Sequence, residues 1–444
     1  MTFETVAVLL AFLAQEAGHQ HEAAGGEPGE ALFGSYPMSR ESSGTSWQPD
    51  SAPMEAAHFE AGGFEMMLHG FLDFGYSSEP EPRGESEAFT TSMLMLGGRR
   101  PLGNGAFGFR VMGSLEPVMG RSGYPLLLQT GETADGTTPL LDRQHPHDVL
   151  MEMAVTYSHP TTRESSFFVY AAPVGEPALG PPAFMHRESS GGNPFAPIGH
   201  HWFDATHITY GVITVGWNEL NKAKIEASIF NGREPDENRW DVDSMKLDSY
   251  SLRFTLNPTE NWSVQGSFAS LNEPELLHQG IDFLRITASA TYNRRRDRGN
   301  WQSTLAWGRN KRERTVLSVD PTVVLTHNHW TGSDTIPGVV IAPVMVQNAF
   351  LAESAFRFAD AHSLFARLEW VEKDELFTVE DPRHIEVFNV GKLNLGYSFD
   401  FVRSRWLGLS AGIAGSVHFL PAGLDTAYGE TPASFYGFVR ARLR

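Results

Sequence analysis

Apolar and polar residues alternate along much of the chain, most regularly in its second half. The segments Tyr250–Leu256, Leu284–Tyr292 and Leu393–Phe401 each place an apolar residue at every second position. Side chains alternate between the two faces of a strand, so each segment predicts a strand with one apolar and one polar face. Many such strands with no helical segment between them predict a sheet with lipid outside and water inside.

We expect about sixteen strands, which makes the fold class all-β: a transmembrane antiparallel β-barrel. Their expected spans are residues 64–77, 88–98, 105–117, 149–158, 165–172, 207–217, 222–231, 246–256, 261–271, 282–293, 299–310, 347–358, 362–371, 386–402, 405–419 and 434–444. An even number of strands is usual for bacterial outer-membrane barrels.

The links between these spans alternate between short and long. The short links are 99–104, 159–163, 218–221, 257–260, 294–298, 359–361 and 403–404. The long links include 118–148, 173–206, 232–245, 311–346, 372–385 and 420–433. Outer-membrane barrels have short periplasmic turns and longer outer loops, so the sorting of the links predicts the same fold independently.

Composition narrows the class of protein further. The chain is 41% hydrophobic with a mean hydropathy of −0.26, and no stretch approaches the roughly 20 apolar residues of a spanning helix. Cysteine is absent, which excludes disulfides and thiolate metal sites. The net charge of −19 argues against nucleic acid as a partner and indicates an acidic rim or lumen that attracts cations. The same charge is also explained by the solubility of exposed loops.

These patterns divide the chain into three predicted segments. The short apolar run 6–13 predicts an export signal over residues 1–17, although the usual basic residues before the run are missing and the start could be truncated. Residues 18–63 predict an irregular N-terminal tail or plug segment. Residues 64–444 predict the outer-membrane barrel.

The tail contains the segment Ser39–Met54, which is too polar for a strand. Two interpretations are open. The segment could enter the lumen as a plug, with Trp47 as its anchor and with Arg40 and Asp50 against lumen charges. It could equally remain a disordered periplasmic tail.

Charged residues recur on the face that we expect to line the lumen, because charge at the lipid midplane costs a few kcal/mol. They are Arg253, Arg285, Arg357, Arg367, Arg440, Glu226, Glu353, Glu369 and Asp400. They could set a transverse field that orients a polar solute in a pore. They could instead form an inner salt-bridge network that plugs and stiffens the barrel.

Histidines gather on the long links. The candidate metal ligands there are His145, His147, Asp148, His186, His200, His201, Asp204 and His207, with Met185 as a further donor and His327 and His329 on the sixth long link. Imidazole with carboxylate or thioether neighbours suits copper or zinc. The alternative is that these side chains pack and hydrogen-bond the loops without a metal.

Other motifs are weaker. His19 and His21 in the tail, and His58, Met66, Met67 and His69 after it, form a mixed set that would suit copper. No nucleotide-binding or nucleophile-elbow motif occurs. The pairs Ser416 with His418 and Asp204 with His207 are the hydrolase candidates, and we expect both to be structural, so no enzyme activity is expected.

Four segments resemble those of a largely uncharacterised family of bacterial outer-membrane proteins. They are Ser39–Met54, Tyr124–Thr133, Asp142–Asp148 and His200–His207. Some members of that family are associated with copper and heavy-metal resistance. The resemblance implies an outer-membrane, porin-like barrel over nearly the whole chain, without settling a solute.

The expected function is a porin-like channel for small polar solutes, cationic or metal-bearing. The alternative is a plugged, non-transporting barrel that acts as a surface scaffold and binds a metal or an envelope protein partner through its outer loops. An outer-membrane hydrolase is a third hypothesis. Expected partners are outer-membrane lipid and lipopolysaccharide, and a second copy of the chain in a homo-oligomer.

Overall fold

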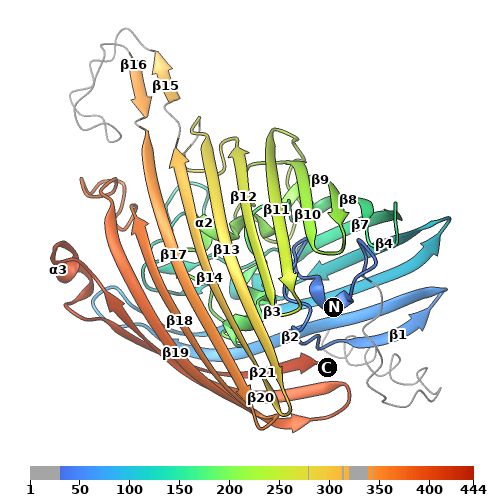
Figure 1. Ribbon diagram of the computed structural model, residues 1–444. Coiled ribbons are helices and arrows are strands. Elements are labelled where there is room, and N and C mark those ends of the chain that lie inside the picture. Colours follow the sequence, from blue (N-terminus) through green and yellow to red (C-terminus); the bar gives the residue numbers. More distant parts are fainter. Residues whose placement is uncertain (1–30, 279, 313–314, 320–338, 343) are drawn as a thin grey trace.

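Sixteen strands of the described residues form one closed antiparallel barrel (Figure 1). The computed structural model describes residues 31–278, 280–312, 315–319, 339–342 and 344–444. The barrel strands are β2 (Phe64–Ser78), β3 (Ser86–Leu102), β4 (Gly105–Gly113), β7 (Leu150–Pro160), β8 (Ser166–Gly175), β9 (Thr209–Glu219), β10 (Ala223–Phe230), β11 (Ser249–Thr259), β12 (Trp262–Leu271), β13 (Phe283–Arg296), β14 (Gly299–Arg312), β17 (Met345–Phe358), β18 (His362–Lys373), β19 (Phe388–Arg403), β20 (Leu407–Phe419) and β21 (Ala433–Leu443).

Each strand pairs with the next along the chain, and the seam between first and last strands closes the barrel. At that seam Leu72 of β2 lies opposite Ala441 of β21, and the pairing runs from Phe71 to Ser78 of β2. Strand β1 (Ala57–Ala61) pairs with the first five residues of β2. Closure leaves no free edge in the wall, as lipid requires.

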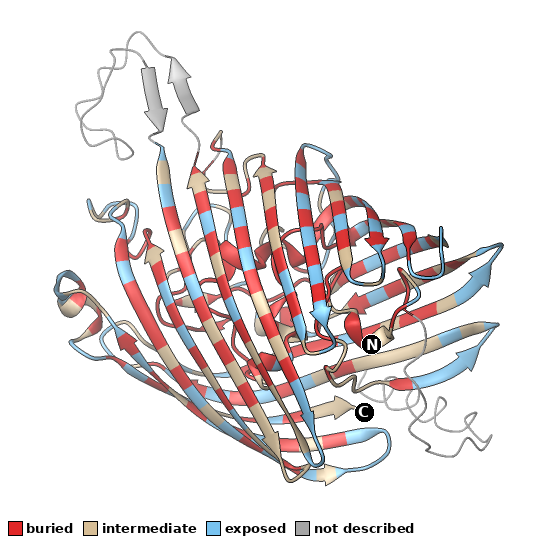
Figure 2. Ribbon diagram, in the orientation of Figure 1, coloured by how far each residue is buried: buried red, intermediate tan, exposed pale blue. Residues whose placement is uncertain are grey.

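The outer face of the wall is apolar. Along β11, buried and exposed residues alternate strictly, and the exposed ones include Tyr250, Leu252 and Phe254, the last two 52% exposed. Figure 2 shows the same alternation of burial on the neighbouring strands. No helix among the described residues is long and apolar enough to span a bilayer. A closed barrel with such an exterior has its wall in lipid, and the protein is an outer-membrane β-barrel.

The two ends of the barrel differ. Turns of a few residues join strands at the periplasmic end, and the long links at the outer end contain short elements that fold inward. These elements are β5 (Tyr124–Pro125), β6 (Arg143–Gln144), η2 (Glu116–Met119), η3 (Phe184–His186), η4 (Glu188–Ser190), α2 (His200–Phe203), η5 (Ala205–His207), η6 (Ala422–Leu424) and α3 (Asp425–Tyr428). Between β14 and β17, β15 (Thr315–Val319) and β16 (Val339–Ala342) pair with each other as a separate hairpin.

The lumen is packed by side chains from the long loops and from the N-terminal segment. Leu127, Ile198 and Trp202 of two loops form one apolar cluster with Ala349 and Val371 of the inner wall. The indole N–H of Trp202 donates to the backbone carbonyl of Gln347 at 3.2 Å. The loops are therefore part of the core and do not extend into solvent.

The predicted barrel of sixteen strands with long outer loops is confirmed, with local differences. The expected strand 105–117 ends at Gly113, and Pro117 lies in the following turn η2, because proline cannot donate to the ladder. Strand β1 and the hairpin of β15 and β16 were not predicted. The expected signal over 1–17, His19, His21, His327 and His329 lie outside the described residues.

Candidate functional site

The nine charged residues expected in the lumen lie on the inner wall. Eight of them are buried and Arg357 is half-buried. Glu226 lies opposite Arg253 on the next strand, and the two side chains form an ion pair of 3.0 Å. Glu353 and Arg367 are likewise opposite each other, at 2.7 Å. Cross-strand pairing thus neutralises most of the wall charges in place.

Other wall charges find partners that sequence reasoning did not name. Arg440 pairs with Asp73 across the seam at 2.5 Å, and Asp73 was not predicted. Arg285 donates to Asn310 at 2.8 Å, and the Glu369 carboxylate accepts from the backbone of Gly199 at 3.1 Å.

Arg187, between η3 and η4, ties a loop to the wall. Its guanidinium lies 2.9 Å from Glu353 and 2.7 Å from Asp204, and the side chain is buried. Glu353 therefore bridges Arg187 and Arg367. Asp204, one of the expected metal ligands, is the counterion of Arg187 and a partner of His200 at 2.8 Å.

The N-terminal segment, residues 31–56, lies against the inner wall near the periplasmic end. Arg253 donates to Thr45 Oγ1 at 2.9 Å, and Asn257 donates to the carbonyl of Gln48 at 2.9 Å. Further along, Glu55 forms ion pairs with Arg357 at 2.5 Å and with Arg442 at 3.0 Å. The segment thus crosses from β11 to β17 and β21 by polar contacts.

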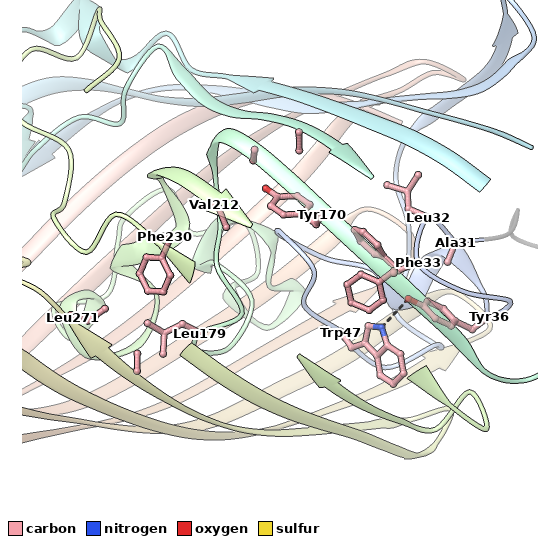
Figure 3. Close-up of a cluster of buried hydrophobic side chains, with 14 of the residues drawn as sticks. Ala31, Leu32, Phe33, Tyr36, Trp47, Tyr170, Leu179, Val212, Phe230 and Leu271 are labelled. Carbon is pink, nitrogen blue, oxygen red and sulfur yellow. Dashed lines mark hydrogen bonds between the residues drawn. The ribbon is translucent and has the colours of Figure 1, made fainter. Parts of the chain in front are cut away.

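An aromatic anchor holds the segment. Trp47 and Tyr36 are buried, and the indole N–H of Trp47 donates to the Tyr36 hydroxyl at 3.1 Å (Figure 3). Arg40 and Asp50 pair with each other through two bonds of 2.6 and 2.7 Å, so the expectation that they meet lumen charges is wrong. Asp50 cancels the Arg40 charge locally, and the guanidinium stacks 4.7 Å from the Trp47 ring.

The histidines of the long loops separate into two groups, which lie side by side. In the first, donor atoms of His145, His201 and Glu132 all lie within 4.8 Å of one another. His201 also approaches Glu234 at 3.4 Å. Burial alone lowers the pKa of His201, but Glu234 and Glu132 outweigh it and raise that pKa. Glu132 and Glu234 were not predicted.

In the second group, three imidazoles surround the ring of Phe184. The ring centroid of His207 lies 5.1 Å from that of His147 and 5.2 Å from that of His200. His147 Nδ1 pairs with Glu116 at 2.8 Å, and His207 Nδ1 with the Asp204 carbonyl at 2.7 Å. The Nδ1 atoms of His147 and His207 are thus engaged in hydrogen bonds.

Two of the predicted ligands lie apart from both groups. Asp148 pairs with Arg239 at 3.3 Å and accepts from Tyr210. His186 lies against His69 of β2, with 6.2 Å between ring centroids. Sequence spacing could not separate these residues, since each loop folds back over a different part of the wall.

A further buried cluster has no counterpart in the sequence predictions. Donor atoms of Glu275, His278 and Glu375 lie within 4.8 Å of one another, and Arg312 pairs with Glu375 at 3.3 Å. The spacing of Glu275 and His278 was a weak signal on one loop. Glu375 comes from another loop, so only the fold brings the three together.

A cavity of about 420 Å³ opens at the periplasmic end. Its lining includes Asn300 and Asp360 near the short turns, Glu55 of the N-terminal segment, and His69 and His186. The hydrolase candidates lie away from it: His418 Nδ1 pairs with the Pro432 carbonyl at 3.1 Å, and Ser416 accepts from Asn394 at 2.9 Å.

Glu176 predicts a pH dependence of stability. Burial raises the pKa of this loop carboxyl to about 8, although Arg253 and the hydroxyl of Ser43, which donates to it at 3.2 Å, act in the opposite direction. Between about pH 4.5 and 8 the folded protein holds a proton that the unfolded chain releases, so stability falls as pH rises. As pH rises through this range, we expect the unfolding free energy of Glu176→Gln to fall less steeply than that of wild type. The difference in slope should be up to about 1.4 kcal/mol per pH unit, measured by urea unfolding.

Glu164→Gln, in the exposed turn between β7 and β8, is the matched control. Equal pH profiles for the two variants between pH 5 and 8.5 would contradict the assignment.

Comparisons with known proteins agree on the architecture. No family model matches the sequence, and no curated protein matches it. OmpF of Salmonella typhi, solved in complex with daunomycin, aligns over 87% of this chain and 100% of its own at 8% identity, with a TM-score of 0.50. An anion-selective porin from Comamonas acidovorans aligns over 85% and 99% at 12% identity, with a TM-score of 0.48.

The outer-membrane channel DcaP of Acinetobacter baumannii aligns over 87% of this chain and 99% of its own at 11% identity, with a TM-score of 0.46. Because the OmpF match is only 8% identical, it shows a similarity of fold alone. This chain has a porin-like barrel. The association with copper resistance stays a prediction.

Proposed function

We propose that the barrel is a gated channel for small cationic solutes, closed in the described arrangement by residues 31–56 and the inward loops. The observation that carries this proposal is the chemistry of the wall behind the N-terminal segment. Most inward residues of β11 and β12 are polar, with Ala269 and Leu271 as the apolar exceptions. The polar ones are Ser251, Arg253, Thr255, Asn257, Ser263, Gln265 and Ser267. Water can satisfy such a wall when the segment leaves, whereas an apolar wall would collapse onto itself.

The attachment of the segment supports a removable closure. Residues 31–56 form no strand of the barrel. They meet β11, β13, β17 and β21 through hydrogen bonds and ion pairs, and they pack against β8 through Phe33 and Phe168, whose ring centroids lie 4.8 Å apart. Polar contacts exchange with water at a small net cost each, so the segment can move without opening the wall.

The charge of the outer mouth supports a preference for cationic solutes. The link 231–248 carries three basic residues against six acids, which are Glu234, Asp236, Glu237, Asp241, Asp243 and Asp248. A mouth of one net sign concentrates ions of the opposite sign. The net charge of −19 acts in the same direction.

A reversible tether tests the closure. Ser51 Oγ of the segment meets Asn293 Nδ2 of the wall at 2.9 Å, and the chain contains no cysteine. In planar bilayers we expect S51C/N293C to stay closed when the disulfide is formed and to show conductance steps after reduction. In a salt gradient the reversal potential of the open state should indicate preference for cations.

The single variants S51C and N293C are the controls, and mass spectrometry checks the bond. A deletion of residues 31–54 should be open under both conditions, with heat-modifiable gel mobility to show that its barrel has folded. If the folded deletion variant stays silent, the channel is wrong and the scaffold hypothesis takes its place.

A specific observation favours metal binding at the outer loops as a second candidate. Two imidazoles and a carboxylate, from His145, His201 and Glu132, suit Zn²⁺ or Cu²⁺, and Glu234 can complete the set. We expect H145A/H201A to lose one equivalent of zinc relative to wild type in equilibrium dialysis. H147A/H200A is the matched control, and equal zinc uptake by all three proteins would remove this site.

A further inference from the structure

Imidazole and thioether side chains are among the residues that line the periplasmic cavity. Met67 and His69 lie two residues apart on β2, so their side chains share its inner face. Met185 and His186 of η3 line the same cavity from the opposite side. Of the mixed set suggested by the sequence, His58 is exposed on β1 and Met66 lies on the other face of β2. The fold therefore selects Met67 and His69 and adds Met185 and His186.

The two imidazoles have nitrogens available to a ligand. His69 Nδ1 lies 2.7 Å from the backbone carbonyl of Glu55. A carbonyl only accepts, so Nδ1 carries the proton and Nε2 keeps its lone pair. This is the arrangement by which proteins orient a metal-binding histidine. His186 Nε2 is shielded from solvent and has no hydrogen-bond partner among the described residues.

The separation of the rings suits a shared ion. Their centroids are 6.2 Å apart. A metal–nitrogen bond is about 2.0 Å long, and each nitrogen lies about a ring radius from its centroid, so one ion can bridge two rings at this distance.

Thioethers surround this pair. Met67 and Met185 pack against a cluster of inward methionines, and together they make six of the 14 in the chain: Met67, Met93, Met95, Met112, Met151 and Met185. Leucine would fill this apolar space with a better-defined shape, since methionine is flexible and specifies packing weakly. Thioether sulfur contributes what leucine lacks, a donor for soft metal ions.

We propose that this cavity binds copper(I) between the imidazoles of His69 and His186, with the thioethers of Met67 and Met185 completing the coordination. All four ligands are neutral and two of them are soft thioethers, which favours Cu(I) over Zn²⁺, whose usual ligands are thiolate, imidazole and carboxylate. The cavity opens toward the periplasm near Asn300 and Asp360, so the ion exchanges with that compartment. Binding needs no passage through the barrel. Since Glu55 of the closing segment holds His69 at 2.7 Å, the site belongs to the closed arrangement of the channel proposed above.

Competition for Cu(I) tests the site in the full-length protein in detergent. Cu(I) is supplied as its bicinchoninate complex under ascorbate, and transfer to the protein is followed by loss of the complex's absorbance. We expect wild type to take up one equivalent. H186A, H69A and M185L should each weaken binding at least about tenfold. X-ray absorption of the loaded protein should show both nitrogen and sulfur neighbours.

Two controls separate this site from the rest of the molecule. M245L, at an exposed methionine of an outer loop, should bind Cu(I) as wild type does, and so should H145A/H201A. Native-like heat-modifiable mobility shows that each variant has folded. The proposal is overturned if wild type takes up no Cu(I), if H186A and M185L both bind as wild type, or if equimolar Zn²⁺ displaces the copper. A silent barrel in conductance experiments would leave these results unaffected.

Discussion

Replacing Glu226 by glutamine is expected to lower the free energy of unfolding by about 3–5 kcal/mol. Glu226 is the shared counterion of Arg253 at 3.0 Å and of Lys224 at 3.3 Å, and all three side chains are buried. Glutamine has nearly the same shape but no charge, so both cations would remain in the lumen without compensation. The measurement is urea unfolding of the barrel in lipid vesicles.

Glu219→Gln is the matched control for this substitution. Glu219 ends the neighbouring strand β9 and is exposed, and its carboxylate accepts from the indole of Trp217 at 2.7 Å. A change at such a site is expected to stay within about 0.5 kcal/mol. If both variants unfold alike, the lumen contains enough water to solvate the cations, and the tight packing described above is wrong.

Arginine in place of Ile413 is expected to cost about 2–4 kcal/mol of unfolding free energy. Ile413 lies at the middle of β20 and is 68% exposed on the outer face. The middle of a spanning strand lies near the bilayer midplane, where a charge is most costly. The same unfolding measurement in vesicles gives the difference from wild type.

Ile413→Leu keeps the surface apolar and is the control for the arginine variant. A second comparison uses Leu407→Arg at the periplasmic end of the same strand, where the expected cost falls to about 0–1 kcal/mol. A cost that did not depend on depth would mean that β20 does not face lipid as assigned.

Most of the barrel could be predicted because the alternation of apolar and polar residues that specifies each strand is a local pattern. Lipid outside and polar groups inside force a period of two, and Tyr250–Leu256 displays that period without reference to any other part of the chain. The alternation of short and long links depends equally little on tertiary contacts. Strand β1 was missed because its five residues, Ala57–Ala61, are mostly exposed and so lack the alternation.

The contents of the lumen were much less predictable. Glu226 and Arg253 could be assigned inward from the strand pattern, but their pairing depends on register. Histidine spacing could not show that His145 meets Glu132 and His201 while His186 faces His69, because loop paths depend on packing. Metal binding, the solute and the homo-oligomer stay predictions.

Met67 and His69 show how a weak pattern gains meaning from the fold. On the sequence they are two residues of a first strand, and Met66 looks equally suitable. Pairing of β2 with β3 and β21 assigns Met66 to the lipid face and Met67 to the lumen. Only the loop that brings Met185 and His186 opposite them makes the group a candidate site.

The position of the seam constrains how this molecule is assembled. Residues 31–56 directly precede β1 and β2, lie inside the wall, and bind β21 through Glu55 and Arg442. Strands β2 and β21 are the first and last of the barrel and join only once the final strand has been made. The sealed cylinder therefore encloses the beginning of its own chain, and the contact between Glu55 and Arg442 can form only after the last strand has been made, so the final step of synthesis supplies the docking site for the first part of the chain.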